Sequence, residues 1–232
     1  MDTKLKLGLF FLLFSVLSLA FFSVNLTYLV GAEAQSFSMF QFIGPVGAGI
    51  FGPFIGIISI LFVEIVNGVF LNQFQFSLFN VARFFPMLAA AYYFGTVKND
   101  KRFGIALPLI GMALFWINPI GAEAWGYALL WLIPIAATFL SGNLYLRSLG
   151  STFQAHIVGS IAFLYLVGMP AAAWWALIPI VLIERGLFAA GISLTYVAFN
   201  SILGAAENAF SLKVPGVQVE RQYALVQAKK EE

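Results

Sequence analysis

Residues 52–70 read Gly-Pro-Phe-Ile-Gly-Ile-Ile-Ser-Ile-Leu-Phe-Val-Glu-Ile-Val-Asn-Gly-Val-Phe, and this stretch decides the fold class. A helix that crosses a bilayer needs ~20 predominantly apolar residues, and the stretch has about that length. It also contains a carboxylate, Glu64. A charge near the bilayer centre costs at least ~2.5 kcal/mol, so such a residue is usually paired, faces a cavity or marks a solute pathway. The stretch therefore predicts a membrane helix whose carboxylate faces the inside of a helix bundle.

The composition extends this interpretation to the whole chain. Of the 232 residues, 61% are hydrophobic and 9% are charged, whereas about 25% of the residues of a soluble domain are charged. Backbone groups in hydrocarbon must bond to one another, and the long apolar runs do not alternate, so helices are favoured over barrel strands. We predict an all-α, polytopic integral membrane helix bundle. The chain has no cysteine, which excludes disulfides and thiolate metal sites.

The apolar segments predict about eight spanning or half-spanning helices, within a range of six to eight. The stretch 37–71 is too long for one span, and Gly52 followed by Pro53 is typical of a helix end and a new helix start. The last segment is too long for a core of ~30 Å, so we expect Pro179 to bend it or its start to lie outside the bilayer. The predicted helices are 5–30, 37–51, 54–71, 78–94, 103–117, 125–146, 153–167 and 172–203.

The basic residues predict the orientation. With eight passes every Lys and Arg outside the spans falls on one side, and the opposite loops carry none, so the positive-inside rule places both termini in the cytoplasm of a multi-pass cell-membrane protein. We assign 1–204 to the bundle and 205–232 to a cytoplasmic C-terminal tail. The start of the chain also fits a secretory signal peptide, but its apolar run exceeds the usual ~7–15 residues. The basic residues on the predicted cytoplasmic side are Lys4, Lys6, Lys98, Lys101, Arg102, Arg147, Lys213, Arg221, Lys229 and Lys230.

Polar residues inside the apolar spans predict a binding pocket. Residues three apart share a helix face, as Glu64 and Asn67 do, and the topology brings the polar groups of several helices to one level in the outer half of the bundle. The predicted solute-binding residues are Glu64, Asn67, Asn80, Arg83, Asn118, Trp125, Glu184 and Arg185, with Trp116 and Trp174 as further walls of the mouth. The structural alternative is that these charges only pair with each other and fix the packing.

No sequence motif of a known catalytic site appears. HExxH, GxSxG and P-loop patterns are absent, so we expect no enzymatic activity, no cofactor and no metal. His156 is expected near the inner end of its helix, away from the carboxylates. A membrane-embedded enzyme that uses Glu64, His156 or Glu184 as acid or base is the alternative.

A family resemblance supplies a more specific hypothesis. The run Phe51-Gly52-Pro53-Phe54-Ile55-Gly56, followed by Glu64, resembles the second-to-third helix region of the substrate-binding S-components of energy-coupling-factor (ECF) transporters. Pro179 with Glu184-Arg185 is similar to the start of their last helix. S-components usually have about six spans rather than eight, and the Ala-x-x-x-Ala docking motif of their first helix is not reproduced by Ser15, Ser18 and Ala20.

The resemblance implies the function and the partners. It implies a subunit of an importer that captures a polar micronutrient from outside. It also implies a membrane coupling subunit and cytoplasmic ATPases as partners, with no nucleic acid. The alternative from another class is a non-transporting structural subunit of a membrane complex.

Overall fold

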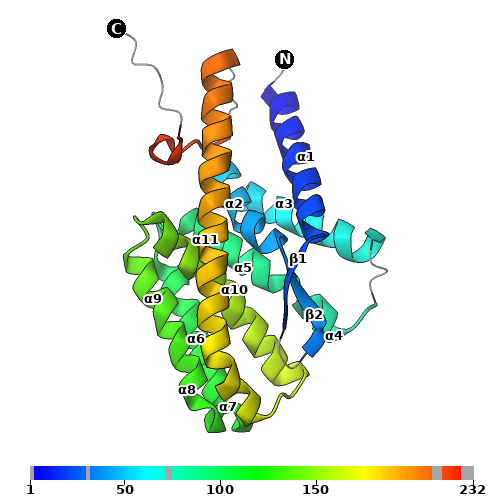
Figure 1. The fold of residues 1–232 in the computed structure, drawn as a ribbon, viewed down its shortest axis with the longest axis vertical. Helices are drawn as coiled ribbons and strands as arrows, with labels where there is room; N and C mark the ends of the chain where they lie inside the picture. Colours follow the sequence, from blue (N-terminus) through cyan, green and yellow to red (C-terminus); the bar gives the residue numbers. More distant parts are fainter. Residues whose placement is uncertain (1–2, 30–31, 72–74, 211–215, 226–232) are drawn as a thin grey trace.

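The structure is a computed structural model that describes residues 3–29, 32–71, 75–210 and 216–225, and it is predominantly α-helical (Figure 1). The all-α class is therefore confirmed. The α-helices are α1 (Thr3–Phe22), α2 (Phe40–Phe51), α3 (Pro53–Ile65), α4 (Leu78–Ala82), α5 (Phe85–Thr96), α6 (Arg102–Ile117), α7 (Pro119–Glu123), α8 (Trp125–Ala128), α9 (Leu132–Phe139), α10 (Leu144–Leu166) and α11 (Ala171–Phe210). A π-helical turn, η1 (Val66–Leu71), extends α3, and short 3-10 helices lie at η2 (Leu129–Trp131) and η3 (Arg221–Tyr223).

Three helical segments of the described residues are long and apolar enough to cross a membrane: Pro53–Phe70, Leu144–Leu166 and Ala171–Ala209. Shorter apolar helices accompany them at Gly8–Phe22, Phe40–Phe51, Arg102–Ile117 and Trp125–Phe139. By length and composition these helices could cross a membrane, and the embedding and the number of crossings stay predictions. The start of α1 and the end of α11 lie at the same end of the molecule (Figure 1).

The break between α2 and α3 lies where the sequence predicts it. Gly52 has a φ of 79°, in the left-handed region that glycine adopts without steric cost, and Pro53 begins the next helix. The two helices then pack very closely, because a side chain at Gly56 would collide with the backbone of Ala48. Small residues at such positions let membrane helices approach each other.

The first predicted span is too long. α1 ends at Phe22, and the chain then forms an antiparallel hairpin of β1 (Asn25–Leu29) and β2 (Ala32–Ser38), in which Asn25 pairs with Ser38. The prediction of a helix to residue 30 followed the apolar residues alone. It gave too little weight to Asn25, Thr27 and Tyr28, of which Thr and Tyr favour strands.

Two further boundaries differ from the prediction. The fourth span is split into α4 and α5, with Pro86, which has no N–H to donate, in the first turn of α5. α10 begins at Leu144, nine residues before the predicted start, because the Asn143 side chain caps it by accepting a hydrogen bond from the Leu146 N–H. Asn at an N-cap is a readable signal, and the prediction ran a helix through it. As a result Arg147 lies on α10 rather than in a loop.

The last helix is longer than expected. α11 has 40 residues and contains Pro179 without ending there. It continues to Phe210, seven residues beyond the predicted end of this helix at 203. The predicted basic residues Lys213, Lys229 and Lys230 lie outside the described residues.

Residues 216–225, which we name the C-terminal strap, fold back onto the end of the bundle. The Gln218 N–H donates to the Ile50 carbonyl at 2.6 Å, and the Tyr223 hydroxyl donates to the Gly142 carbonyl at 3.1 Å. Val217 and Val219 pack against the core formed by α2, α5 and the end of α11. The strap therefore ties together elements that are far apart in the sequence.

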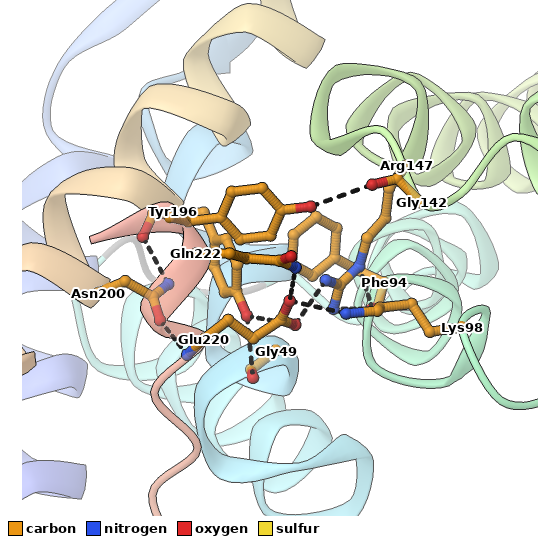
Figure 2. A network of polar contacts seen from close by, with 10 residues as sticks. Gly49, Phe94, Lys98, Gly142, Arg147, Tyr196, Asn200, Glu220 and Gln222 are labelled. Carbon is orange, nitrogen blue, oxygen red and sulfur yellow. Dashed lines mark hydrogen bonds and ion pairs between the residues drawn. The ribbon is translucent and has the colours of Figure 1, made fainter. Parts of the chain in front are cut away.

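Glu220 is the centre of the strap's polar contacts (Figure 2). Its Oε2 accepts from Lys98 Nζ at 2.7 Å, and its Oε1 accepts from Arg147 Nη1 and from the Tyr196 hydroxyl, each at 2.9 Å. Its backbone N–H donates to Asn200 Oδ1 at 2.6 Å. Burial by itself would raise the pKa of Glu220, but the hydrogen bond from Lys98 and the charge of Arg147 outweigh it and lower the pKa to about 2.

Candidate functional site

A cavity of about 200 Å³ lies among the end of α3, the α4–α5 junction, α8, α10 and the first half of α11. Residues of α1, β2 and the start of α2 complete its wall. Two of the helix boundaries place residues in the cavity wall. Arg83 lies at the turn between α4 and α5, and His156 lies on α10.

Four of the eight predicted site residues line this cavity: Glu64, Arg83, Glu184 and Arg185. They come from three separate parts of the chain, as the prediction of one polar level requires. The remaining four are placed outside the cavity lining.

Those four residues have other positions. Asn67 lies in the π-helical turn beyond α3. The Asn80 side chain donates to the Gln75 carbonyl at 2.8 Å, and Asn118 Oδ1 accepts the Ile120 N–H at 3.0 Å, which caps α7. Trp125 is exposed, and its carbonyl accepts from the indole N–H of Trp116 at 3.0 Å. The side chains of Asn80 and Asn118 thus contribute to local structure rather than to the cavity wall.

Glu64 is the buried carboxylate of the site. It lies one residue before the end of α3, and it is 9% exposed. Its Oε2 has no hydrogen-bond partner among the described residues. Arg83 is the positive charge that interacts with it electrostatically, but no ion pair within 4 Å joins the two in the part of the chain that the structure describes. The pair therefore neutralises charge without satisfying the carboxylate.

Arg185 is the buried cation, with a side chain 2% exposed. Its Nη1 donates to Thr152 Oγ1 at 3.3 Å, and its Nη2 lies 3.6 Å from Glu184 Oε2. Its guanidinium carbon lies 5.1 Å from the ring centroid of Phe37 and 4.5 Å from that of Phe188, which are cation–π distances. Its Nε has no hydrogen-bond partner among the described residues.

A third polar group in the cavity wall consists of Tyr127, His156 and Ser160. The Tyr127 hydroxyl lies 2.9 Å from His156 Nε2 and 3.3 Å from Ser160 Oγ. When Nε2 accepts from Tyr127, the neutral imidazole carries its proton on Nδ1. The expectation that His156 lies apart from the carboxylates is wrong, because all of them line the same cavity.

Sequence reasoning did not find Tyr127, Ser160, Gln41 or the β2 residues Phe37 and Ser38 as cavity residues. A single hydroxyl in an apolar helix gives no spacing signal, and the hairpin was assigned to helix and loop. Trp174, which the sequence suggested as a wall, does line the cavity.

Comparisons with protein families, with curated proteins and with solved structures found no match to this chain. The chemistry of the site is therefore read from its own residues. The cavity offers two carboxylates, two guanidinium groups, a hydroxyl–imidazole cluster and aromatic walls, an arrangement that can hold a small polar molecule by charge and hydrogen bonds.

Proposed function

We propose that this chain is a membrane-embedded binding subunit that captures a small polar solute, as the S-components of ECF importers do. The observation that carries the proposal is the convergence of two Glu and two Arg side chains from three parts of the chain on one cavity. Ionisable residues at such depth in an apolar bundle are costly, and in membrane proteins they mark solute sites. The resemblance supplies the partners, a coupling subunit and cytoplasmic ATPases.

The basic residues support the orientation that this function requires. Lys98 and Arg147 both contact Glu220, and Arg221 follows it in the strap, so these cations gather at one end of the bundle. In the proposed topology this end is cytoplasmic and both termini lie on its side. Solute would reach the cavity from the opposite side.

A second candidate function is acid–base chemistry on a bound solute. It is favoured by one observation, the position of the Tyr127–His156 hydrogen bond in the same cavity as Glu64 and Glu184. A general base must lie within hydrogen-bond reach of its substrate, and His156 meets that condition for a molecule in the cavity. Chemical identity distinguishes the candidates, because a binding subunit returns the solute unchanged.

The test is to fill the cavity. Gly159 lines it, and the nearest atom to a Cβ added there is Pro86 Cγ at 4.0 Å, so a larger side chain has space to enter. Gly8 on α1 is exposed, with no atom within 4 Å of an added Cβ, and it gives the matched control. We expect full-length protein purified in detergent to release one small molecule on denaturation, detected by mass spectrometry.

The variants decide between the possible functions. Gly8→Phe should retain the molecule and Gly159→Phe should lose it while remaining folded. If Gly159→Phe retains the molecule, the cavity is not its binding site. If neither the wild type nor Gly8→Phe carries a molecule, the structural-subunit alternative becomes the better explanation.

A further inference from the structure

The cavity wall contains two carboxylates and two guanidinium groups, and we propose that its ligand is a small zwitterion, with a cationic and an anionic group on an apolar body. This inference rests on the proposed function, since it names the class of solute. Glu64 and Glu184 supply two carboxylates, and Arg83 and Arg185 supply two guanidinium groups. A ligand with a net charge would add an uncompensated charge to this set of two negative and two positive groups, whereas a zwitterion leaves the sum unchanged.

The unsatisfied atoms of the site have opposite charge. Glu64 Oε2 and Arg185 Nε are both buried, and neither has a hydrogen-bond partner among the described residues. Leaving a buried polar group without a partner costs about 1–3 kcal/mol, and more when the group is charged. Both residues line the cavity, so a ligand with a donor of positive charge and an acceptor of negative charge would complement them.

Internal pairing does not remove this requirement. Arg185 already uses Nη1 on Thr152 and Nη2 on Glu184, and its Nε still has no partner in the part of the chain that the structure describes. Arg83 is not within ion-pair distance of Glu64. We therefore expect the ligand's ammonium at Glu64 and its carboxylate at Arg185.

The walls and the volume limit the size of the ligand. Phe163, Trp174 and Leu177 supply apolar surface, and the Tyr127–His156 cluster offers a further hydrogen bond. Pockets for drug-sized ligands measure about 300–1,000 Å³, and this cavity measures about 200 Å³. An amino-acid-sized zwitterion with a hydrophobic side chain fits that volume and those walls.

The experiment compares probes that share a side chain and differ in which charged groups they carry. The first series is L-phenylalanine, 2-phenylethylamine and 3-phenylpropanoate, and the second is L-leucine, 3-methylbutylamine and 4-methylpentanoate. Each is added at the same millimolar concentration to the purified full-length protein, and the midpoint of thermal unfolding is measured. A probe that binds only the folded protein raises the midpoint by mass action. We expect an amino acid to bind at least about tenfold more tightly than its amine and its acid.

A variant that removes a single charge separates an effect on probe binding from an effect on folding. Glu64→Gln is nearly isosteric, and we expect it to leave the midpoint of the ligand-free protein within about 2 °C of the wild type while it abolishes the tenfold advantage of the amino acid over the acid. The advantage over the amine should persist, because Arg185 is unchanged. Arg185→Gln, if it folds, should give the reverse pattern.

Several results would overturn the inference. An amine or an acid that binds as tightly as its amino acid is one, and an equal loss for all three probes in Glu64→Gln is another. If no probe binds, the molecule lost from Gly159→Phe decides: a compound with both charges supports the inference, and a neutral or singly charged compound overturns it. If no probe binds and no molecule is released, the proposed function itself fails, and the inference fails with it.

Discussion

The charges around Glu220 (the strap cluster) and those around Glu64 (the cavity cluster) differ in how completely they are hydrogen-bonded. In the strap cluster both carboxylate oxygens of Glu220 accept hydrogen bonds (Figure 2). Arg147, whose side chain is 3% exposed, donates from Nε and Nη2 to the Phe94 carbonyl and from Nη1 to Glu220. In the cavity cluster Glu64 Oε2 and Arg185 Nε have no partner among the described residues.

The difference separates structural charges from candidate binding charges. A buried polar network with every member bonded makes the packing rigid, whereas one with gaps costs free energy in the unliganded protein. The strap cluster also connects α2, α5, α10 and α11 at the end of the bundle that the strap covers. We therefore expect changes in the strap cluster to affect stability and changes in the cavity cluster to affect binding.

The largest effect is expected at Arg147. Arg147→Met keeps much of the apolar volume but removes both donors to the Phe94 carbonyl and one of the donors to Glu220, and hydrogen bonds to a charged group contribute about 1.5–3 kcal/mol each. We expect the midpoint of thermal unfolding in detergent to fall accordingly. Arg102→Met is the control, since Arg102 is 93% exposed and its ion pair with Asp100 spans 3.8 Å. Equal midpoints for the two variants would show that the strap cluster does not stabilise the fold.

The second effect depends on pH and concerns Glu220. Its pKa is about 2 in the folded protein against an ordinary value of 4.5, so its carboxylate stabilises the fold fully above pH 4.5. That contribution is lost as the pH falls from 4.5 towards 2, because protonation is easier in the unfolded chain.

Glu220→Gln should therefore be less stable than the wild type at neutral pH by about 1.5–3 kcal/mol, the value of hydrogen bonds to a charged group. The difference should shrink as the pH falls through this window, measured as the difference in unfolding midpoint at each pH. A difference that stays constant from pH 7 to about 2 would contradict the assignment of the shift to Glu220.

The smallest effect is expected at Asn118, which lies outside both clusters. Asn118→Ala removes the cap of α7, a change that typically costs about 1 kcal/mol. Solute binding should be unchanged, because the residue does not line the cavity. Loss of the co-purified molecule from this variant, with its midpoint lowered by only that amount, would show that the binding site extends beyond the cavity described.

The helix breaks and the cavity residues were predictable from the sequence to different degrees. Gly52-Pro53 was readable because a positive φ and a missing N–H are properties of the residues themselves. The N-cap signal of Asn143 is equally local, but the apolar residues on either side of it led to the prediction of one continuous helix. Glu64, Arg83, Glu184 and Arg185 were found because charge inside an apolar helix is costly wherever it occurs. His156 and Tyr127 were not found as cavity residues, because their positions depend on where α10 begins and on how α8 packs against it.

The sequence by itself determined that the chain is helical and apolar, that α2 and α3 separate at Gly52, and that a few charges are buried among apolar residues. These follow from propensity, hydropathy and the cost of removing a charge from water, all of which act within a few residues. Only the tertiary structure decided that Glu220 satisfies Arg147 while Glu64 keeps an unbonded oxygen. Hydrogen bonding depends on distances of about 3 Å between atoms that the sequence separates by tens of residues, and packing alone fixes those distances.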